Sequence, residues 1–272
     1  MGEATKRIRR RRAAKSKVTE LVDNPENVVV VHYSCESFYD RDDGSSPRIT
    51  SIAVRNLGTG QTTSFSIHQL AERDKKLTVE SINQNYNELE KKMLKEFYEY
   101  VEKHSGHTWL HWNMRDINFG FPALAHRCRT LGGKPFDIHE SRLCDLARLL
   151  VSLFGVGYAG HPRLASLVEK NNISDLNFLN GEEEAAAFVN GEYVKLHQST
   201  LRKVDILANI AERTANDSLK TDAKTKEIYG SYPAAIVEFL RDHWIFTIIG
   251  IVGGLASIIA LVIYLLEKSN GG

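Results

Sequence analysis

A carboxylate follows directly after the most apolar strand-like stretch of the chain. Residues 28–31 are four valines, and polarity then rises sharply at Ser34, Cys35 and Glu36. Consecutive β-branched residues are typical of a strand buried on both faces. In open α/β sheets ligands bind at the carboxyl ends of the strands, and Glu36 would lie at such an end. We therefore predict a functional carboxylate at Glu36. The alternative is a core strand followed by a turn with a solvated glutamate.

Regular elements that would position this residue can be predicted from side-chain periodicity. A hairpin is expected from strands at residues 49–57 and 62–67, joined by Gly58-Thr59-Gly60. An apolar stripe with helical spacing predicts a long helix over residues 78–104. A short strand is expected at 108–111, and it breaks into a polar run that ends at Asp116. Further helical or apolar periodic segments are expected at 119–131, 143–154, 162–170, 181–190 and 199–213.

Three local patterns carry a family resemblance. The first strand ends in S-C-E at residues 34–36, where the family has Asp-x-Glu. His111 and Asp116 keep the spacing of the motif H-N-x-x-F-D, and His197 is a candidate for the family's last histidine. With the order strand, hairpin, helix, strand and several helices, these patterns resemble the DEDDh-type 3′–5′ exonucleases over residues 28–213. The resemblance implies an α/β, ribonuclease H-like fold with a mixed sheet flanked by helices.

The resemblance also implies roles for individual residues. The catalytic candidates are Glu36, Asp116, His197 and a displaced Asp205. Glu36 and Asp116 would bind Mg²⁺ or Mn²⁺, because two-metal hydrolysis clamps the reacting oxygens between cations about 4 Å apart. The candidates for ligand binding are Ser34, His111, Asn113, Arg115 and Arg202.

Two departures from the family pattern point away from catalysis. Ser34 and Arg202 stand where the family has acidic residues. An arginine in place of a carboxylate opposes the binding of a second cation. It would instead pair with Glu36 or Asp116, or bind a phosphate through two hydrogen bonds. The pattern therefore favours a domain that binds a nucleic acid end or a nucleotide without cleaving it.

Structural roles remain open for several of these residues. Lone histidines such as His111 and His197 are most often ordinary core or surface residues, and Asp116 is also suited to capping a helix. Residues 182–184 are most simply a solvated first helical turn. Asp145 matches no family position, so we expect a structural role for it.

Charge is distributed unevenly along the chain. Residues 1–17 hold eight of the 35 Lys and Arg and one of the 34 Asp and Glu, so the remainder has a net charge of −6. We expect residues 1–26 to be a disordered basic arm. Such an arm binds nucleic acid, an anionic membrane surface or no particular partner, and the membrane span predicted below favours the membrane surface. The three cysteines show no C-x-x-C spacing, which argues against a disulfide framework.

A membrane span is predicted near the C-terminus. Residues 244–266 contain 23 residues without a formal charge, and Trp244 and Tyr264 lie near the two ends. At 1.5 Å per residue the stretch is about 34 Å long, enough to cross a hydrocarbon core of about 30 Å. Lys and Arg on its N-terminal side place the body in the cytoplasm. Gly250 and Gly254 have the spacing of a helix-pairing motif, which would allow a homo-oligomer.

The predicted organisation is therefore a basic arm at 1–26, an exonuclease-like domain at 27–213, a tether at 214–243, a transmembrane helix at 244–266 and a short tail at 267–272. The leading hypothesis is a membrane-anchored binding module, and by analogy of architecture a sensor or effector in host defence. An active metal-dependent exonuclease and a membrane-tethered protein-interaction scaffold are the alternatives.

Overall fold

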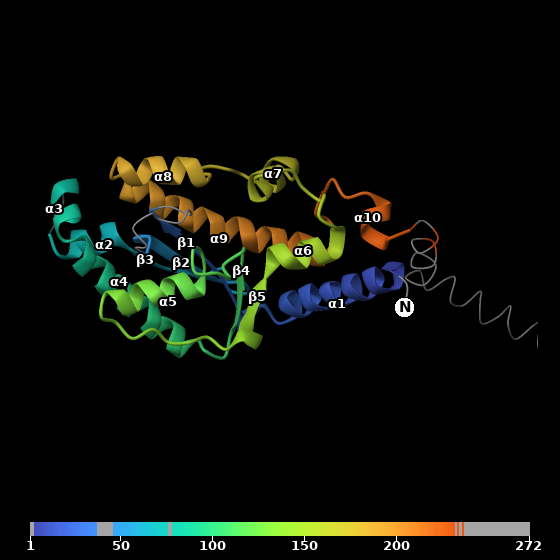
Figure 1. Ribbon diagram of the computed structural model, residues 1–272, viewed down its shortest axis with the longest axis horizontal. Helices are drawn as coiled ribbons and strands as arrows, with labels where there is room; N and C mark the ends of the chain where they lie inside the picture. The colour runs from blue at the N-terminus through green and yellow to red at the C-terminus, as the bar shows by residue number, and fades with distance from the viewer. Residues whose placement is uncertain (1–2, 37–45, 76–77, 232, 234–235, 237–272) are drawn as a thin grey trace, which may run out of the picture.

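A mixed five-stranded sheet forms the centre of the protein. The computed structural model describes residues 3–36, 46–75, 78–231, 233 and 236 (Figure 1). The strands are β1 (Val28–Cys35), β2 (Ile49–Asn56), β3 (Thr62–Ser66), β4 (Thr108–His111) and β5 (Leu143–Asp145), in the order β3-β2-β1-β4-β5. The pairs β1–β2 and β2–β3 are antiparallel, whereas β1, β4 and β5 run parallel. The predicted α/β class with a mixed sheet flanked by helices is confirmed.

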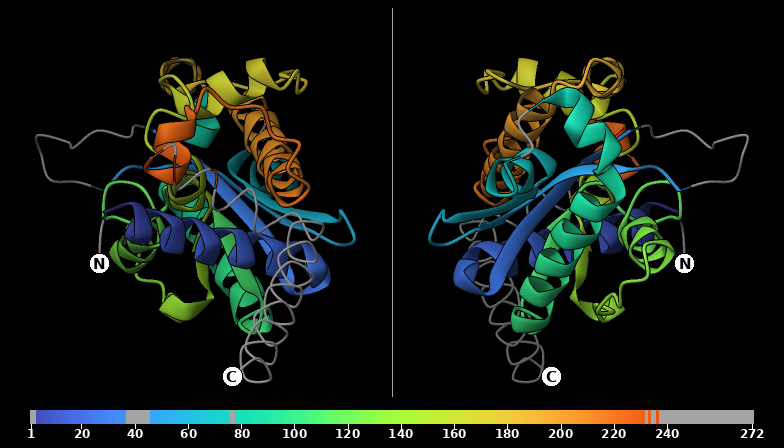
Figure 2. Two further views of the ribbon diagram at one scale, coloured as in Figure 1. Left: turned by 90° about the vertical axis from the view of Figure 1, so that its right-hand side faces the viewer. Right: turned by 90° about the vertical axis from the view of Figure 1, so that its left-hand side faces the viewer.

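Ten α-helices are described around this sheet. They are α1 (Glu3–Asp23), α2 (Ile67–Arg73), α3 (Val79–Gln84), α4 (Tyr86–Lys103), α5 (Phe121–Thr130), α6 (Leu146–Phe154), α7 (Arg163–Lys170), α8 (Gly181–Val189), α9 (Tyr193–Ala215) and α10 (Thr225–Tyr229). Short 3₁₀ helices lie at Pro25–Asn27 and Glu140–Arg142. In Figure 2 the sheet lies between α9 on one side and α4 on the other.

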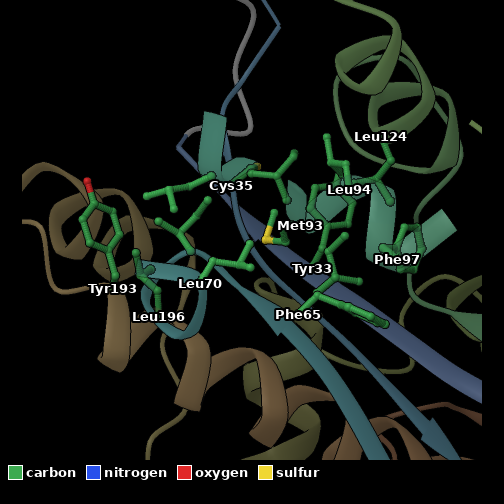
Figure 3. Close-up of a cluster of buried hydrophobic side chains, with 14 of the residues drawn as sticks. Tyr33, Cys35, Phe65, Leu70, Met93, Leu94, Phe97, Leu124, Tyr193 and Leu196 are labelled. Carbon is green, nitrogen blue, oxygen red and sulfur yellow. The ribbon is translucent and has the colours of Figure 1, made fainter. Parts of the chain in front are cut away.

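Strand β1 is buried along its whole length because both of its faces are covered. Val29, Val31 and Tyr33 belong to one apolar cluster, which includes Met93 and Phe97 of α4 (Figure 3). Successive side chains of a strand point to opposite faces. Val28 and Val30 accordingly belong to a second cluster, which contains residues of α1, α6 and α9. The four valines therefore serve two cores, as the sequence predicts.

The helix expected over residues 78–104 is two helices. Thr78 caps α3 by accepting a hydrogen bond from the amide of Ser81 at 3.1 Å. Asn85 separates α3 from α4, and its side-chain amide donates to the Ser81 carbonyl at 2.8 Å. An asparagine side chain that bonds to a nearby carbonyl competes with the helical ladder. The apolar stripe continues across the break, which is why periodicity alone did not reveal it.

The expectation of a disordered basic arm is wrong for the described part of that segment. Residues 3–23 form α1, which packs against α6, α9 and α10. Ala14, Val18 and Leu21 are buried in the second cluster, at helical spacings of four and three residues. The burial of this short apolar stripe offsets the conformational entropy lost when the helix forms. The stripe was not recognised in the sequence because positively charged residues surround it.

The boundary expected at residue 213 is also not where the folded body ends. Helix α9 runs to Ala215, and Leu219 is buried beyond it. The Asn171 side chain donates to the carbonyl of Lys220 at 3.0 Å and accepts from its amide at 2.8 Å. The amide of Asp222 donates to the Tyr158 carbonyl at 2.8 Å. The described part of the expected tether is therefore packed on the domain through side-chain contacts that a local pattern does not show.

The predicted membrane span, its helix-pairing glycines and the tail lie outside the described residues. Within the described ranges, no helix is both long and apolar enough to cross a membrane.

The docking of α1 gives a stability prediction. Leu21 is 2% exposed, so truncation to alanine should lower the free energy of unfolding by about 2–5 kcal/mol. Urea unfolding of the full-length protein in mild detergent, followed by tryptophan fluorescence, measures this. The exposed Ser16 on the same helix provides the control, and Ser16→Ala should change stability by less than about 0.5 kcal/mol. Equal stability of Leu21→Ala and the parent would show that α1 is a dispensable arm.

Candidate functional site

The carboxylate predicted at the end of β1 is engaged by an arginine. Glu36 accepts hydrogen bonds from a terminal nitrogen of Arg48 at 2.8 Å and from its Nε at 3.1 Å. The guanidinium also lies over the rings of Tyr86 and Phe188, 5.0 and 4.7 Å from their centroids. The hydrogen bond that Arg48 donates to Glu36 raises the pKa of Arg48. This bidentate pairing balances the charge of Glu36 and uses both of its oxygens.

The second predicted carboxylate holds a turn. Asp116 Oδ1 accepts hydrogen bonds from the amides of Asn118 at 3.0 Å and Phe119 at 2.8 Å. His111 is buried at the end of β4, and its Nδ1 accepts from the Met114 amide at 3.2 Å. Burial lowers the pKa of His111 to about 4, so this imidazole is neutral at pH 7. Both residues therefore support the loop after β4.

The ligand-binding candidates Asn113 and Arg115 tie that loop to α6. Asn113 has a positive φ of 55°, and its amide donates to Asp145 Oδ1 at 3.3 Å. Arg115 forms an ion pair with Asp145 Oδ2 at 2.8 Å and donates to the Asn113 side chain at 2.8 Å. Asp145 also caps α6 by accepting from the amides of Ala147 and Arg148. This confirms the structural role expected for Asp145.

Helix α9 carries three predicted site residues, which face different surroundings. His197 is buried with its ring 4.9 Å from that of His68, and burial lowers its pKa to about 4. Arg202 Nε donates to the Ser174 carbonyl at 2.9 Å. Asp205 forms an ion pair with Arg55 at 3.2 Å. Arg202 is therefore directed to the α7–α8 connection, and Asp205 to strand β2.

These positions do not fit a two-metal site. Ser34, which stands at a family acid position, is fully buried, and its hydroxyl has no hydrogen-bond partner. Glu36, Asp116 and Asp205 are each engaged by a different partner, as described above. In the part of the chain that the structure describes, no group of three His, Cys, Asp or Glu side chains is arranged to hold a metal ion. The donor set that Mg²⁺ or Mn²⁺ would need is therefore not assembled there.

A cavity of about 230 Å³ lies instead at the carboxyl ends of β1 and β4. The chain leaves β1 towards β2, while β4 lies on the other side of β1. Such a switch point leaves a crevice that ligands occupy in open α/β sheets. The lining combines aromatic, apolar and polar side chains: His32, Trp112, Asn113, Phe119, Pro162, Leu164, Ala165, Phe178, Leu179, Asn180, Gly181 and Lys203. This cavity is the candidate functional site.

His32 is the unsatisfied group in the wall of this cavity. It is 5% exposed, and neither ring nitrogen has a hydrogen-bond partner. Burial, and secondarily the nearby Lys203, lowers its pKa well below the usual range. The neutral ring lies 5.8 Å from that of Phe119, which stacks on Tyr33 at 4.5 Å. A buried polar group without a partner costs about 1–3 kcal/mol, so a ligand that bonded to His32 would recover that cost.

A buried ion pair contributes Lys203 to the lining of the cavity. Lys203 Nζ lies 2.8 Å from Glu184 Oε1, and the side chains are 6% and 0% exposed. The Ser199 hydroxyl also donates to Glu184, at 3.1 Å. Lys203 lies 5.6 Å from the centroid of the Phe178 ring. Glu184 therefore anchors α8 to α9, which corrects the expectation that it belongs to a solvated helical turn.

Sequence reasoning overlooked His32, Lys203 and Glu184 as members of the site. One signal for His32 was available, because it lies on the same side of the strand as Ser34 and Glu36 and comes directly after the run of buried valines. No comparable local signal marked the other two residues, which lie on different helices.

Comparisons with known proteins add no relative. A scan against protein-family models, a search of curated proteins and a search of solved structures each find no match to this chain.

The buried pair gives a prediction about charge. Lys203→Met leaves Glu184 buried without its cation, so the free energy of unfolding should fall by about 3–5 kcal/mol. Glu184→Gln combined with Lys203→Met should cost less than the sum of the single changes. Urea unfolding of the four proteins measures the coupling. On the same helix, Lys195 forms an exposed pair with Glu192, and Lys195→Met should cost no more than about 1 kcal/mol. Additive effects in the Lys203–Glu184 cycle would contradict the pairing.

The buried histidines give a prediction about pH. In the unfolded chain His197 binds its proton near pH 6.5, whereas in the folded chain it does so only near pH 4. The unfolded state therefore binds more protons within this window, and stability falls as the pH decreases. His197→Asn should reduce the slope of the free energy of unfolding between pH 6 and pH 5 by about 1 kcal/mol per pH unit. The exposed His126 supplies the control, as His126→Asn. An unchanged slope in His197→Asn would sink the prediction.

Proposed function

We propose that this protein binds a nucleotide, or the terminal nucleotide of a single strand, in the cavity between β1 and β4 without needing a metal ion. The observation that carries the proposal is His32, a buried imidazole with two unpartnered nitrogens in the cavity wall. A heterocyclic base can satisfy such a group by hydrogen bonding. The Asn113 side chain, also in the lining, provides a second polar contact for the edge of a base.

The other lining residues suit a planar, anionic ligand. Trp112 and Phe119 offer aromatic surface, and base stacking on aromatic rings tolerates any base. Lys203 supplies a positive charge in the same lining. Its ammonium group has three hydrogen-bond donors, and the pairing with Glu184 uses only part of them. A volume of about 230 Å³ admits the base and sugar of one nucleotide rather than a duplex.

The state of the expected catalytic acids supports binding over cleavage. Glu36 is committed to Arg48, and Asp116 is committed to the turn that positions Phe119. On β1, Ser34 stands where the family has an acid, and His32 lies two residues before it. In this proposal the domain is an exonuclease-like, ribonuclease H-like fold, because the element order on which the family resemblance rests is present. In this proposal Lys203 binds the phosphate, in place of Arg202.

The second part of the proposal is attachment to a membrane. The uncharged stretch 244–266 would anchor the chain, with the folded body in the cytoplasm and Gly250 and Gly254 available for pairing two copies. A nucleotide-binding domain on one membrane helix would couple ligand binding to a change at the membrane or in a partner protein there. This arrangement suits a sensor in host defence.

Metal-free binding can be measured by titrating full-length protein in mild detergent with the four mononucleotides and with a five-residue oligothymidine. At least one probe should bind in EDTA with the same Kd as in Mg²⁺ or Mn²⁺. His32→Leu should weaken binding roughly 5- to 150-fold, which corresponds to about 1–3 kcal/mol. The same change removes a buried, unpaired polar group, so the free energy of unfolding should hold or rise.

Arg202→Ala is the matched control, because Arg202 donates to the Ser174 carbonyl, and it should bind like the parent. No binding of any probe would leave the interaction scaffold as the better hypothesis. Metal-dependent release of mononucleotides that disappears in Glu36→Gln with Asp116→Asn would establish the active exonuclease instead.

A further inference from the structure

Helix α1 divides its positive charges between two faces, and the inner face is structural. Arg7 Nε donates to the Glu227 carbonyl at 2.7 Å, and another Arg7 nitrogen donates to the Ser152 carbonyl. Arg11 lies over the Tyr229 ring, 4.9 Å from its centroid. Lys15 donates to the Ala215 carbonyl at 2.9 Å and forms an ion pair with Asp217 at 2.6 Å. These three residues, four apart in sequence, attach α1 to the ends of α6, α9 and α10.

The outer face carries the remaining charges of the first half of the helix. Lys6, Arg9, Arg10 and Arg12 are exposed, and no acidic residue occurs between positions 4 and 19. From residue 6 to residue 12 the helix rises about 9 Å. That is close to the Debye length of about 8 Å at physiological ionic strength, so the four charges act on a partner together.

The C-terminal part of the described chain contacts the first turn of the same helix. Helix α10 packs against α1, and the two are neighbours in Figure 1. A Cβ on Gly230 would lie 3.0 Å from Cα of Ala4, so the chain passes in contact with the first turn of α1. From there the sequence continues to the uncharged stretch 244–266. Lys224, which precedes α10, and Lys226 within it are also exposed near this exit.

We propose that the outer face of α1 binds the anionic lipid headgroups of the membrane in which residues 244–266 are anchored. The proposal rests on the proposed membrane attachment and adds a defined lipid-binding surface to it. Lipid is favoured over nucleic acid because the charged face belongs to the helix whose first turn contacts the chain that leads to the predicted span. Basic residues near a span are attracted to anionic leaflets. The contact would hold the folded body against the membrane on its α1 side.

The test uses full-length protein with a donor fluorophore on Ala13→Cys. Ala13 is exposed on α1, and the three native cysteines are buried. The protein is reconstituted in vesicles of phosphatidylcholine alone or with phosphatidylserine, each with a headgroup acceptor. Energy transfer should be at least two-fold higher in the anionic vesicles. The difference should disappear in 1 M salt, where the Debye length is about 3 Å, and in a variant with Lys6, Arg9, Arg10 and Arg12 changed to Gln.

The control removes four positive charges elsewhere, by changing the exposed Lys75, Lys95, Lys103 and Lys134 to Gln. It should keep the lipid dependence. Equal transfer in the two vesicle types for the parent protein would overturn the proposal. So would single-stranded nucleic acid binding that is lost in the α1 variant while lipid-dependent transfer persists.

Extraction at pH 11 separates this proposal from the membrane anchor. If carbonate released the protein from vesicles, the anchor proposal would fail. Energy transfer would then be scored after adding the protein to preformed vesicles. A phosphatidylserine-dependent signal would still support the lipid-binding face, and its absence would refute it.

Discussion

Strand β1 has both faces buried and both edges paired, and this constraint orders the rest of the molecule. Its two edges pair with β2 and β4, which fixes the centre of the sheet. One face requires the apolar surface of α4, and the other requires α9 together with α1. Because nothing solvates the strand along its length, polar chemistry is confined to its carboxyl end and to the helices that close over it. The cavity lined by His32 lies among these surrounding segments, and Lys203 of α9 is part of its lining.

Buried and partly buried carboxylates around the sheet are paired with cations. Glu36 is held by Arg48, Glu184 by Lys203, and Glu90 by Arg127 at 2.6 Å. Burial raises the pKa of Glu90, and the hydrogen bond from Arg127 opposes that shift. Glu90 also accepts a hydrogen bond from the amide of Ile49 at 2.7 Å, which ties α4 to the start of β2. Breaking a buried pair costs more than the pair contributes, so these residues restrain how the helices dock.

Helix α1 shows how one chemical type serves two purposes. Arg7, Arg11 and Lys15 donate to helix-end carbonyls or cover an aromatic ring, and positive charge near helix C-termini is favourable. The charges on the other face are exposed, and exposed charges contribute little to stability. In the proposed arrangement α1 connects the binding domain to the membrane-proximal chain. Its contacts with both α9 and α10 place one rigid element between the cavity helix and the chain exit.

The sequence by itself determined the elements whose signals are local. The valine run defined β1, the turn at Gly58-Thr59-Gly60 defined the β2–β3 hairpin, and the apolar stripe defined α4. Alternation and helical periodicity are properties of neighbouring residues, so they can be read without knowing the fold. The α/β class was implied by the family resemblance, which rests partly on the order of these elements. The polar residues after β4 were also correctly located at a strand end, although not their roles.

Only the tertiary structure decided which side chains meet. Lys203 and Glu184 lie on separate helices. Glu36 and Arg48 are 12 residues apart, and residues 37–45 between them lie outside the described residues. Helix α1 is stabilised because Val18 and Leu21 pack in the same apolar cluster as α6 and α9, since a highly charged helix is only marginally stable in isolation. The sequence predicted a site at the carboxylates of a family motif, whereas the structure indicates a site at His32 and its neighbours. The physical reason is that desolvation and pairing depend on distant segments, and these fix whether a polar residue is engaged or left open to a ligand.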